Sequence, residues 1–119
     1  MTLLRRFWDS AAALDPSAAE LDEGRSMRYC APDELEELWT AVGLEQVSTS
    51  EVVVTAGYEG FEDLWEPLEF GVAPSGAYVA SPSPDRRAEL KADFQQRLGA
   101  GDAPFRLGAR AWFAAGRVP

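Results

Sequence analysis

Only two segments of this chain have the sequence pattern of a β-strand, and they lie far apart. Residues 46–56 contain a β-branched run that includes Val52, Val53 and Val54, and residues 105–115 alternate apolar side chains with polar or small ones. The separation excludes a tight hairpin, but it leaves antiparallel pairing and a parallel pair with a right-handed crossover open. Because a two-stranded sheet is marginal by itself, helices or another chain's strands must cover these two.

Most of the remaining apolar residues recur at helical spacing, and the segments that contain them are predicted to be helices. The longer helical segments are residues 3–14, 32–42, 61–68 and 84–98. In the segment 32–42, the stripe that we expect to be buried consists of Leu35, Leu38, Trp39 and Val42. Helices that alternate with two strands in this order indicate a single α+β domain over residues 1–119.

Capping residues mark the expected ends of these helices. The predicted N-caps are Thr2, Asp15 and Ser83, and the predicted C-terminal glycines are Gly43 and Gly99. Asp15 would cap a short second helix that begins at Pro16, because proline suits the first helical position. Residues 24–31 and 70–82 are predicted to be loops, the latter because Gly, Pro and Ser interrupt it.

The composition excludes several classes of site. The chain has 11 basic and 20 acidic residues and a formal charge of -9, which disfavours a nucleic-acid partner. It has no histidine, so a Ser-His-Asp triad, a Cys-His pair and a His-ligated metal are excluded. Cys30 is the only cysteine, so there is no internal disulfide and no thiolate cage. We predict no catalytic residue and no metal ligand.

Acidic residues are concentrated between Arg28 and Arg86, where no basic residue occurs. The simpler interpretation is a solvated acidic surface. The alternative is a surface that prefers cationic or neutral ligands because of the field it produces.

The N-terminal segment does not have the pattern of a signal peptide, because Arg5 and Arg6 are followed by Asp9 without an apolar run between them. No segment approaches the ~20 apolar residues that a membrane span needs. With a single thiol and no export signal, we expect a cytoplasmic protein with no membrane partner.

Five segments resemble parts of class I S-adenosylmethionine-dependent methyltransferases, in the bacterial group that is similar to ubiquinone-biosynthesis enzymes. LLRRFWDSAAALD at residues 3–15 resembles the helix after the fifth strand of that family. CAPDELEELWTAVGL at residues 30–44 resembles the helix that leads into strand six. FEDLWEPL at residues 61–68 and GAYVAS at residues 76–81 resemble the insertion that caps the substrate side. ARAWFAAGR at residues 109–117 resembles the closing strand seven.

This resemblance implies the C-terminal part of a Rossmann-like methyltransferase fold, with two antiparallel strands packed with about four helices. It also implies a family reaction, the transfer of a methyl group from S-adenosylmethionine to a small molecule. The whole chain would then be the substrate-cap region of such an enzyme.

The cofactor-binding features of that family are missing. The family has a glycine-rich turn after its first strand and an acidic residue after its second strand. The only G-x-G here, Gly99 to Gly101, follows a predicted helix instead. We therefore expect strands one to five to lie upstream of Met1, in a truncated gene, a split enzyme or a domain retained for another use. The isolated chain is expected to bind no cofactor and to be inactive. The alternative is a non-catalytic interaction or small-ligand-binding module derived from a methyltransferase.

The resemblance also indicates candidate residues for a small-molecule substrate and a partner. The candidate substrate-binding residues are Trp8, Trp65, Phe70 and Tyr78. The alternative for Trp8, Trp65 and Tyr78 is packing in the core or at its margin. In the family, strand seven lies between strands five and six, so one edge of residues 105–115 has no partner here. We expect a second copy of the chain, or a separate cofactor-binding half, to pair with that edge. Dimerisation would complete the sheet, and the alternative is a monomer in which the helix of residues 3–14 folds over the free edge.

Overall fold

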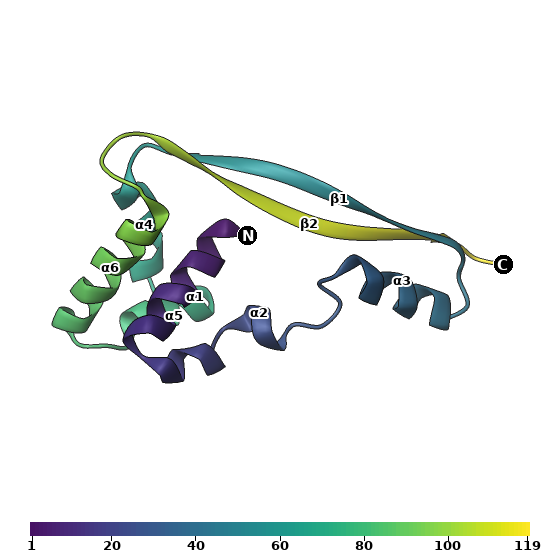
Figure 1. Ribbon diagram of the computed structural model, residues 1–119, viewed down its shortest axis with the longest axis horizontal. Helices are drawn as coiled ribbons and strands as arrows, with labels where there is room; N and C mark the ends of the chain where they lie inside the picture. Colours follow the sequence, from purple (N-terminus) through teal and green to yellow (C-terminus); the bar gives the residue numbers. More distant parts are fainter.

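The computed structural model describes residues 1–119 and has an α+β architecture (Figure 1). Six α-helices and one 3₁₀ helix accompany a single sheet of two antiparallel strands. The elements in chain order are α1 (Thr2–Leu14), η1 (Pro16–Glu20), α2 (Glu23–Ser26), α3 (Pro32–Ala41), β1 (Glu45–Tyr58), α4 (Phe61–Glu69), α5 (Ala73–Ala80), α6 (Pro84–Leu98) and β2 (Phe105–Arg117). None of the helices combines the length and the apolar character needed to traverse a bilayer.

The molecule is elongated because the two strands extend well beyond helices α1, α4, α5 and α6, as far as helix α3 (Figure 1). Its principal extents are 57 × 32 × 21 Å. Its radius of gyration is 17.6 Å, compared with about 13.5 Å for a compact domain of this length. Helices α1, α4, α5 and α6, here called the helical unit, pack at one end of the strands. Helix α3 lies against the other end.

Strands β1 and β2 form an antiparallel ribbon, so the structure decides between the two pairings that the strand pattern left open. The register runs without a slip from Tyr58 opposite Phe105 to Ser48 opposite Ala115. A bulge follows towards the start of β1, where Gln46 has a φ of 52°. Both predicted strands are present, and each extends slightly beyond its predicted range.

The hydrophobic core lies inside the helical unit and includes one residue of the adjoining η1. Its buried residues are Phe7, Trp8, Ala11, Ala18, Phe61, Leu64, Trp65, Val79, Leu90 and Phe94. The Phe94 ring of α6 packs edge-on against Phe7 at 5.6 Å and against Phe61 at 5.8 Å between centroids. Such aromatic pairs add stability beyond the area that they bury. The tertiary stability of the chain therefore depends mainly on this one cluster.

Most of the predicted helix ends are confirmed. Asp15 and Ser83 accept backbone hydrogen bonds as N-caps. Gly43 and Gly99 have φ angles of 88° and 64°, a region that glycine adopts without strain. The prediction for Thr2 is wrong, because Thr2 is already the first residue of α1 and its side chain makes no cap hydrogen bond. An N-cap must lie just outside the helix.

The two predicted loops contain short helices, so the expectation of about four helices is corrected to six. Residues 24–31 include most of α2, and residues 70–82 include all of α5. Glycine weakens an isolated helix, but Gly76 lets α5 approach the end of α4 closely. A Cβ at Gly76 would lie 3.0 Å from the carbonyl carbon of Gly71. Tertiary packing thus offsets the low helix propensity of this segment.

The apolar stripe of α3 is less buried than its pattern predicts. Leu35, Leu38 and Trp39 are half-buried, and Val42 is 68% exposed. Helix α3 packs mainly against the ribbon and stands apart from the core of the helical unit. The prediction of a buried stripe is wrong, because only the two strands are present to cover it.

A buried carboxylate, Asp22, connects α1 to α2. Its side chain is 2% exposed, accepts a hydrogen bond from Arg5 Nη2 at 2.7 Å and accepts another from the backbone N–H of Gly24 at 3.0 Å. We expect Asp22→Ala to lower the free energy of unfolding by about 2–4 kcal/mol, since Arg5 loses an ion-pair partner and α2 loses its cap.

Asp9→Ala is the matched control for this prediction. Asp9 accepts a hydrogen bond from the same guanidinium, from Arg5 Nε at 3.1 Å, but its side chain is 40% exposed. Its loss should cost less than about 1 kcal/mol. Urea unfolding of both variants by circular dichroism measures the difference, and equal losses would contradict the prediction.

Candidate functional site

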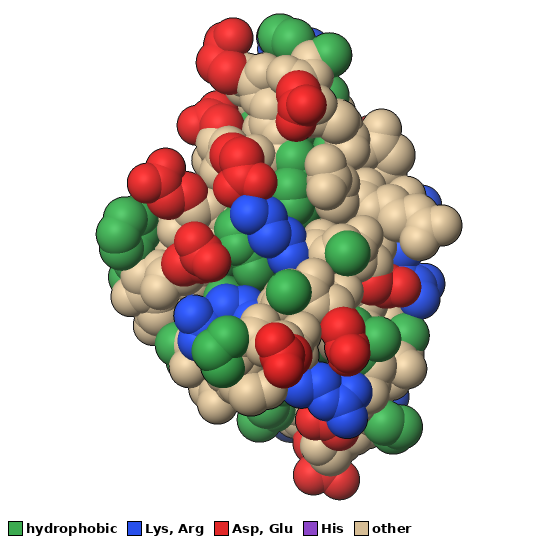
Figure 2. All heavy atoms as spheres, turned by 90° about the vertical axis from the view of Figure 1, so that its left-hand side faces the viewer, with side chains coloured by type: hydrophobic (Ala, Val, Ile, Leu, Met, Phe, Trp, Pro, Cys, Tyr) green, Lys and Arg blue, Asp and Glu red, His purple; other side chains and the backbone are tan.

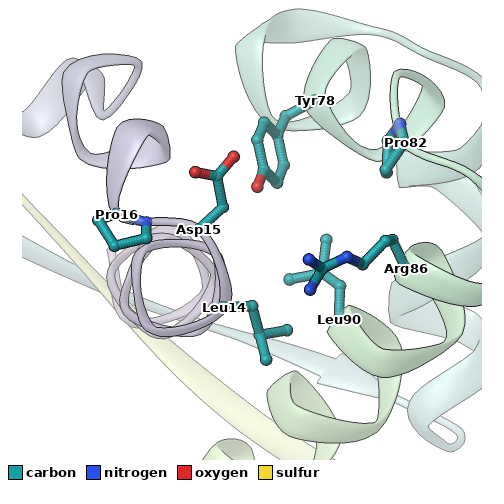
Figure 3. A pocket seen from close by; sticks show the side chains of 7 residues that line it. All are labelled: Leu14, Asp15, Pro16, Tyr78, Pro82, Arg86 and Leu90. Atoms are coloured by element: carbon teal, nitrogen blue, oxygen red, sulfur yellow. The ribbon is translucent and has the colours of Figure 1, made fainter.

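A cavity of about 350 Å³ lies in the helical unit, where the end of α1 meets α5 and the start of α6 (Figure 3). Its lining residues are Leu14, Asp15, Pro16, Tyr78, Pro82, Arg86 and Leu90. Three of these side chains are polar, and they come from three different elements around an apolar floor. A cavity with a few convergent polar groups is the usual form of a small-molecule site.

The turn that begins η1 holds Asp15 in place. Its Oδ1 accepts hydrogen bonds from the backbone N–H of Ser17 at 3.0 Å and from Ser17 Oγ at 2.6 Å. Both bonds use the same oxygen, so Oδ2 is not committed to Ser17. The carboxylate lies beside the Tyr78 ring at the mouth of the cavity (Figure 3). The cap that forms this turn therefore also presents a negative charge to the cavity.

Aromatic neighbours fix the position of Tyr78 on α5. Its ring packs against Trp8 at 5.8 Å and edge-on against Phe7 at 6.2 Å between centroids. Both neighbours belong to the buried core. The half-buried tyrosine is thus held by its ring, while its hydroxyl points into the cavity between Asp15 and Arg86 (Figure 3).

Arg86 extends from the first turn of α6 on the side of the cavity opposite Asp15 (Figure 3). Its Nη1 donates a hydrogen bond to Glu89 Oε2 at 3.3 Å, and both side chains are more than half exposed. No direct ion pair joins Arg86 to Asp15, although the two charges act on each other across the cavity. The mouth thus carries one negative and one positive group that do not neutralise each other by contact.

Hydrogen bonds and burial set the protonation states of the two acidic groups. Hydrogen bonds from the Ser17 side chain and backbone lower the pKa of Asp15, with smaller contributions from Tyr78 and Arg86. Burial, followed by the negative charge of Asp15, raises the pKa of Tyr78. At neutral pH the cavity therefore presents a carboxylate, a neutral phenol and a guanidinium.

The titration of Tyr78 provides a direct test of this arrangement. We expect its phenol to ionise above the ordinary value of 10.0, because both burial and Asp15 oppose a phenolate. The measurement is the phenolate absorbance of the wild type minus that of Tyr78→Phe during alkaline titration. In Asp15→Asn the midpoint should fall, since the repelling charge is gone. A midpoint that is below 10.0 in the wild type, or unchanged in Asp15→Asn, would contradict the arrangement.

The four residues predicted to bind substrate are not brought together in one site. Tyr78 lines the cavity. Trp8 and Trp65 are buried in the core, and Trp8 Nε1 donates a hydrogen bond to Glu23 at 2.9 Å. Phe70 is 73% exposed at the end of α4. The cavity residues that sequence reasoning missed are Asp15, which it predicted only as a cap, and Arg86. Asp15 precedes η1, and Arg86 lies in the first turn of α6. Only the packing of these elements brings the two side chains to opposite sides of one cavity.

The acidic segment does not gather around a site. Every carboxylate between Arg28 and Arg86 is solvent-exposed, which favours the interpretation as a solvated surface. Figure 2 shows carboxylates at the end of the molecule formed by the helical unit, interspersed with basic and apolar side chains. Glu62, for example, pairs with Lys91 at 2.7 Å. No cluster of three or more potential ligand side chains is arranged to hold a metal ion.

The ribbon is a second unusual surface, because large apolar side chains are exposed on both of its faces. The exposed fractions are 48% for Val52, 57% for Val54 and 49% for Phe113 on one face, and 62% for Val53 on the other. The outer edges of β1 and β2 have no paired strand. Phe105 and Leu107 pack against the core, so the helical unit covers one end of the apolar face of β2 and leaves the rest open.

A shallow hollow of about 700 Å³ adjoins this ribbon beside the N-terminus of α1. Its lining includes Met1, Thr2 and Cys30, together with residues of β1 and β2 such as Val53 and Trp112.

No family model, no curated protein and no solved structure matches this chain.

Proposed function

We propose that this chain is the C-terminal, substrate-side portion of a class I S-adenosylmethionine-dependent methyltransferase, which transfers a methyl group to a small molecule. The observation that carries the proposal is the open ribbon. Two adjacent antiparallel strands, joined through a helical insertion, correspond to the order of strand six, cap and strand seven that the sequence resembles. Such a pair belongs at one end of a larger sheet.

The sequence of β1 supports a place inside a larger layered fold. Val52, Val53 and Val54 are consecutive, so they put apolar side chains on both faces of the strand. Continuous apolar runs are typical of strands in sheets that helices cover on both faces. Fully burying each such side chain contributes about 1.5–3 kcal/mol, so covering the ribbon would be strongly favourable.

The cofactor itself does not fit this chain. The junction from β1 to α4 is the only place where a strand leads directly into a helix. Gly60 at this junction is already in close contact with another segment of the chain. A Cβ on Gly60 would lie 3.0 Å from the carbonyl oxygen of Asp102. The N–H of Phe61 donates to the carbonyl of Gly101 at 3.0 Å. No open glycine-rich turn remains there for S-adenosylmethionine.

The role proposed for this chain is therefore to bind and orient the methyl acceptor, while a separate half holds the cofactor. Methyl transfer depends largely on proximity and alignment, and it needs no acid or base from this portion. The free edge of β2 is the natural place for that half to add a strand. In its absence, two copies of this chain pair through the same edge.

Calorimetry with S-adenosylmethionine and S-adenosylhomocysteine tests the proposal. The isolated chain should show no saturable binding. A complex with the polypeptide encoded directly upstream, if that carries a glycine-rich strand–turn–helix, should bind at low micromolar concentration. Saturable one-to-one binding by the isolated chain would contradict the assignment of cofactor binding to a separate half. An upstream polypeptide that has the glycine-rich motif but forms no complex with this chain would contradict the proposal that the chain is part of a methyltransferase.

A small-ligand-binding module without catalysis is the second candidate. The cavity at Asp15, Tyr78 and Arg86 favours it, because a cavity with a few convergent polar groups is the usual form of a small-molecule site. Ligand binding by the chain alone, with no methylation in the presence of the cofactor half, would favour this candidate.

A further inference from the structure

We propose that the cavity between Asp15 and Arg86 binds a small zwitterion of the amino-acid type, with its ammonium group at Asp15, its carboxylate at Arg86 and its aliphatic part against Leu14. The inference does not depend on the methyltransferase proposal, because it is argued only from residues of this chain that line the cavity.

The pair of opposite charges carries the inference. Asp15 comes from the junction of α1 and η1, and Arg86 comes from α6, so the packing of the helical unit holds them at separate positions. They form no direct ion pair, and the one hydrogen bond of Arg86 to a side chain is the exposed contact with Glu89 at 3.3 Å. A ligand with both charges would satisfy both groups at once.

Ligands with one charge satisfy this site less well. A simple cation would pair with Asp15 and leave Arg86 repelling it. A simple anion would pair with Arg86 but would meet Asp15 and the field of a chain with a formal charge of -9. Bidentate pairing of a guanidinium with a carboxylate adds directionality at the Arg86 side.

Tyr78 supplies a neutral donor between the two charges. Its ring is immobilised against Trp8 and Phe7, so the hydroxyl is already positioned before a ligand arrives. Preorganised groups lose less entropy when they bind. Because the hydroxyl hydrogen-bonds to Asp15, it can accept a further hydrogen bond from a ligand ammonium group held at that carboxylate.

The volume of the cavity and its apolar lining determine which uncharged part of a ligand fits. A volume of about 350 Å³ is near the low end of the range for small-molecule sites, roughly 300–1,000 Å³. Leu14, Pro16 and Pro82 offer aliphatic surface, the buried Leu90 closes the cavity behind them, and the lining has no further polar side chain. The expected ligand is thus a compact amino acid with a branched aliphatic side chain.

Three probes that share one aliphatic body test the charge requirement on the isolated chain. L-leucine carries both charges, isoamylamine lacks the carboxylate, and 4-methylpentanoate lacks the ammonium group. Saturation-transfer NMR and calorimetry should show L-leucine binding at least tenfold more tightly than either analogue. Glycine, which has both charges but no aliphatic body, should also bind at least tenfold more weakly than L-leucine.

Two variants should separate the two charges. Asp15→Asn keeps an N-cap of equal quality, so the fold is retained while the charge is lost. Asp15→Asn should weaken the binding of L-leucine at least tenfold. It should bind 4-methylpentanoate as tightly as the wild type does, or more tightly. Arg86→Gln should weaken the binding of L-leucine and of 4-methylpentanoate. It should bind isoamylamine as tightly as the wild type does, or more tightly. Arg6→Gln, at an exposed arginine outside the cavity, is the control and should change none of these affinities.

The inference is overturned if L-leucine does not bind at millimolar concentrations. It is also overturned if the three probes bind equally, or if the two variants leave their affinities unchanged. Circular dichroism of each variant verifies that the helical unit is folded. Because no cofactor and no second polypeptide is present, these outcomes are independent of the calorimetric test of the methyltransferase proposal.

Discussion

Phe94→Ala should remove a large part of the stability of this protein, with a loss of about 3–5 kcal/mol in the free energy of unfolding. The Phe94 side chain is completely buried in α6. Its ring contacts Phe7 of α1 at 5.6 Å, and Phe61 and Trp65 of α4 at 5.8 Å and 6.4 Å between centroids. The substitution therefore opens a cavity at the point where three helices meet.

The effect should be large relative to the total, because a natural domain is stable by only about 5–15 kcal/mol. This chain buries 14 of its 119 residues, and the rest of the ribbon offers no second core. Urea unfolding followed by tryptophan fluorescence is a suitable measurement, since Trp8 and Trp65 lie in the same cluster. We expect Phe94→Ala to be largely unfolded in low urea.

Phe70→Ala is the matched control, because it makes the same chemical change at a side chain that is 73% exposed. It should change the free energy of unfolding by no more than about 0.5 kcal/mol. A loss below about 1 kcal/mol for Phe94→Ala would show that the helical unit does not have the packing described.

The isolated chain should be a dimer at tens of micromolar, with twice the chain mass of 13.0 kDa, and a proline in β2 should convert it to a monomer. The free edge of β2 offers a row of unpaired backbone groups. A twofold axis at Ala111, the midpoint of the strand, would put Phe113 opposite Ala109 and Leu107 opposite Ala115. These two large apolar side chains, Phe113 and Leu107, would then each have an alanine opposite them across the new pair.

Ala109→Pro and Arg110→Pro form the matched pair for this test. Successive amides of a strand point to opposite edges, so one variant removes a donor to β1 and the other removes a donor on the free edge. We expect one of them to stay folded by circular dichroism and to become monomeric by light scattering. The other should destabilise the ribbon itself. A folded wild-type chain that runs as a single species near 13.0 kDa at tens of micromolar would refute the dimer.

Local chemistry explains which elements could be predicted from the sequence. The alternation of residues 105–115 and the β-branched run of residues 46–56 each depend on neighbours within one strand, and both strands are present. Asp15 and Ser83 cap helices through bonds to residues two or three positions further on. Such signals need no knowledge of the rest of the chain.

Features that depend on distant contacts could not be predicted in this way. Helix α5 forms where Gly, Pro and Ser indicated a loop, because Gly76 gains a close contact with the end of α4. The stripe of α3 has the periodicity of a buried face, yet Val42 is 68% exposed because nothing but the ribbon lies near that helix. Periodicity shows that a face is apolar, but it does not show what covers the face.

The sequence by itself thus determined both strands, the longer helices and the chemical classes of site that a chain without histidine cannot form. Only the tertiary structure decided that the strands pair antiparallel, that Trp8 and Trp65 belong to the core, and that Asp15, Tyr78 and Arg86 share one cavity. The physical reason is the range of the interactions. Caps and periodic patterns act within one element, whereas the cavity arises where elements far apart in the sequence pack together.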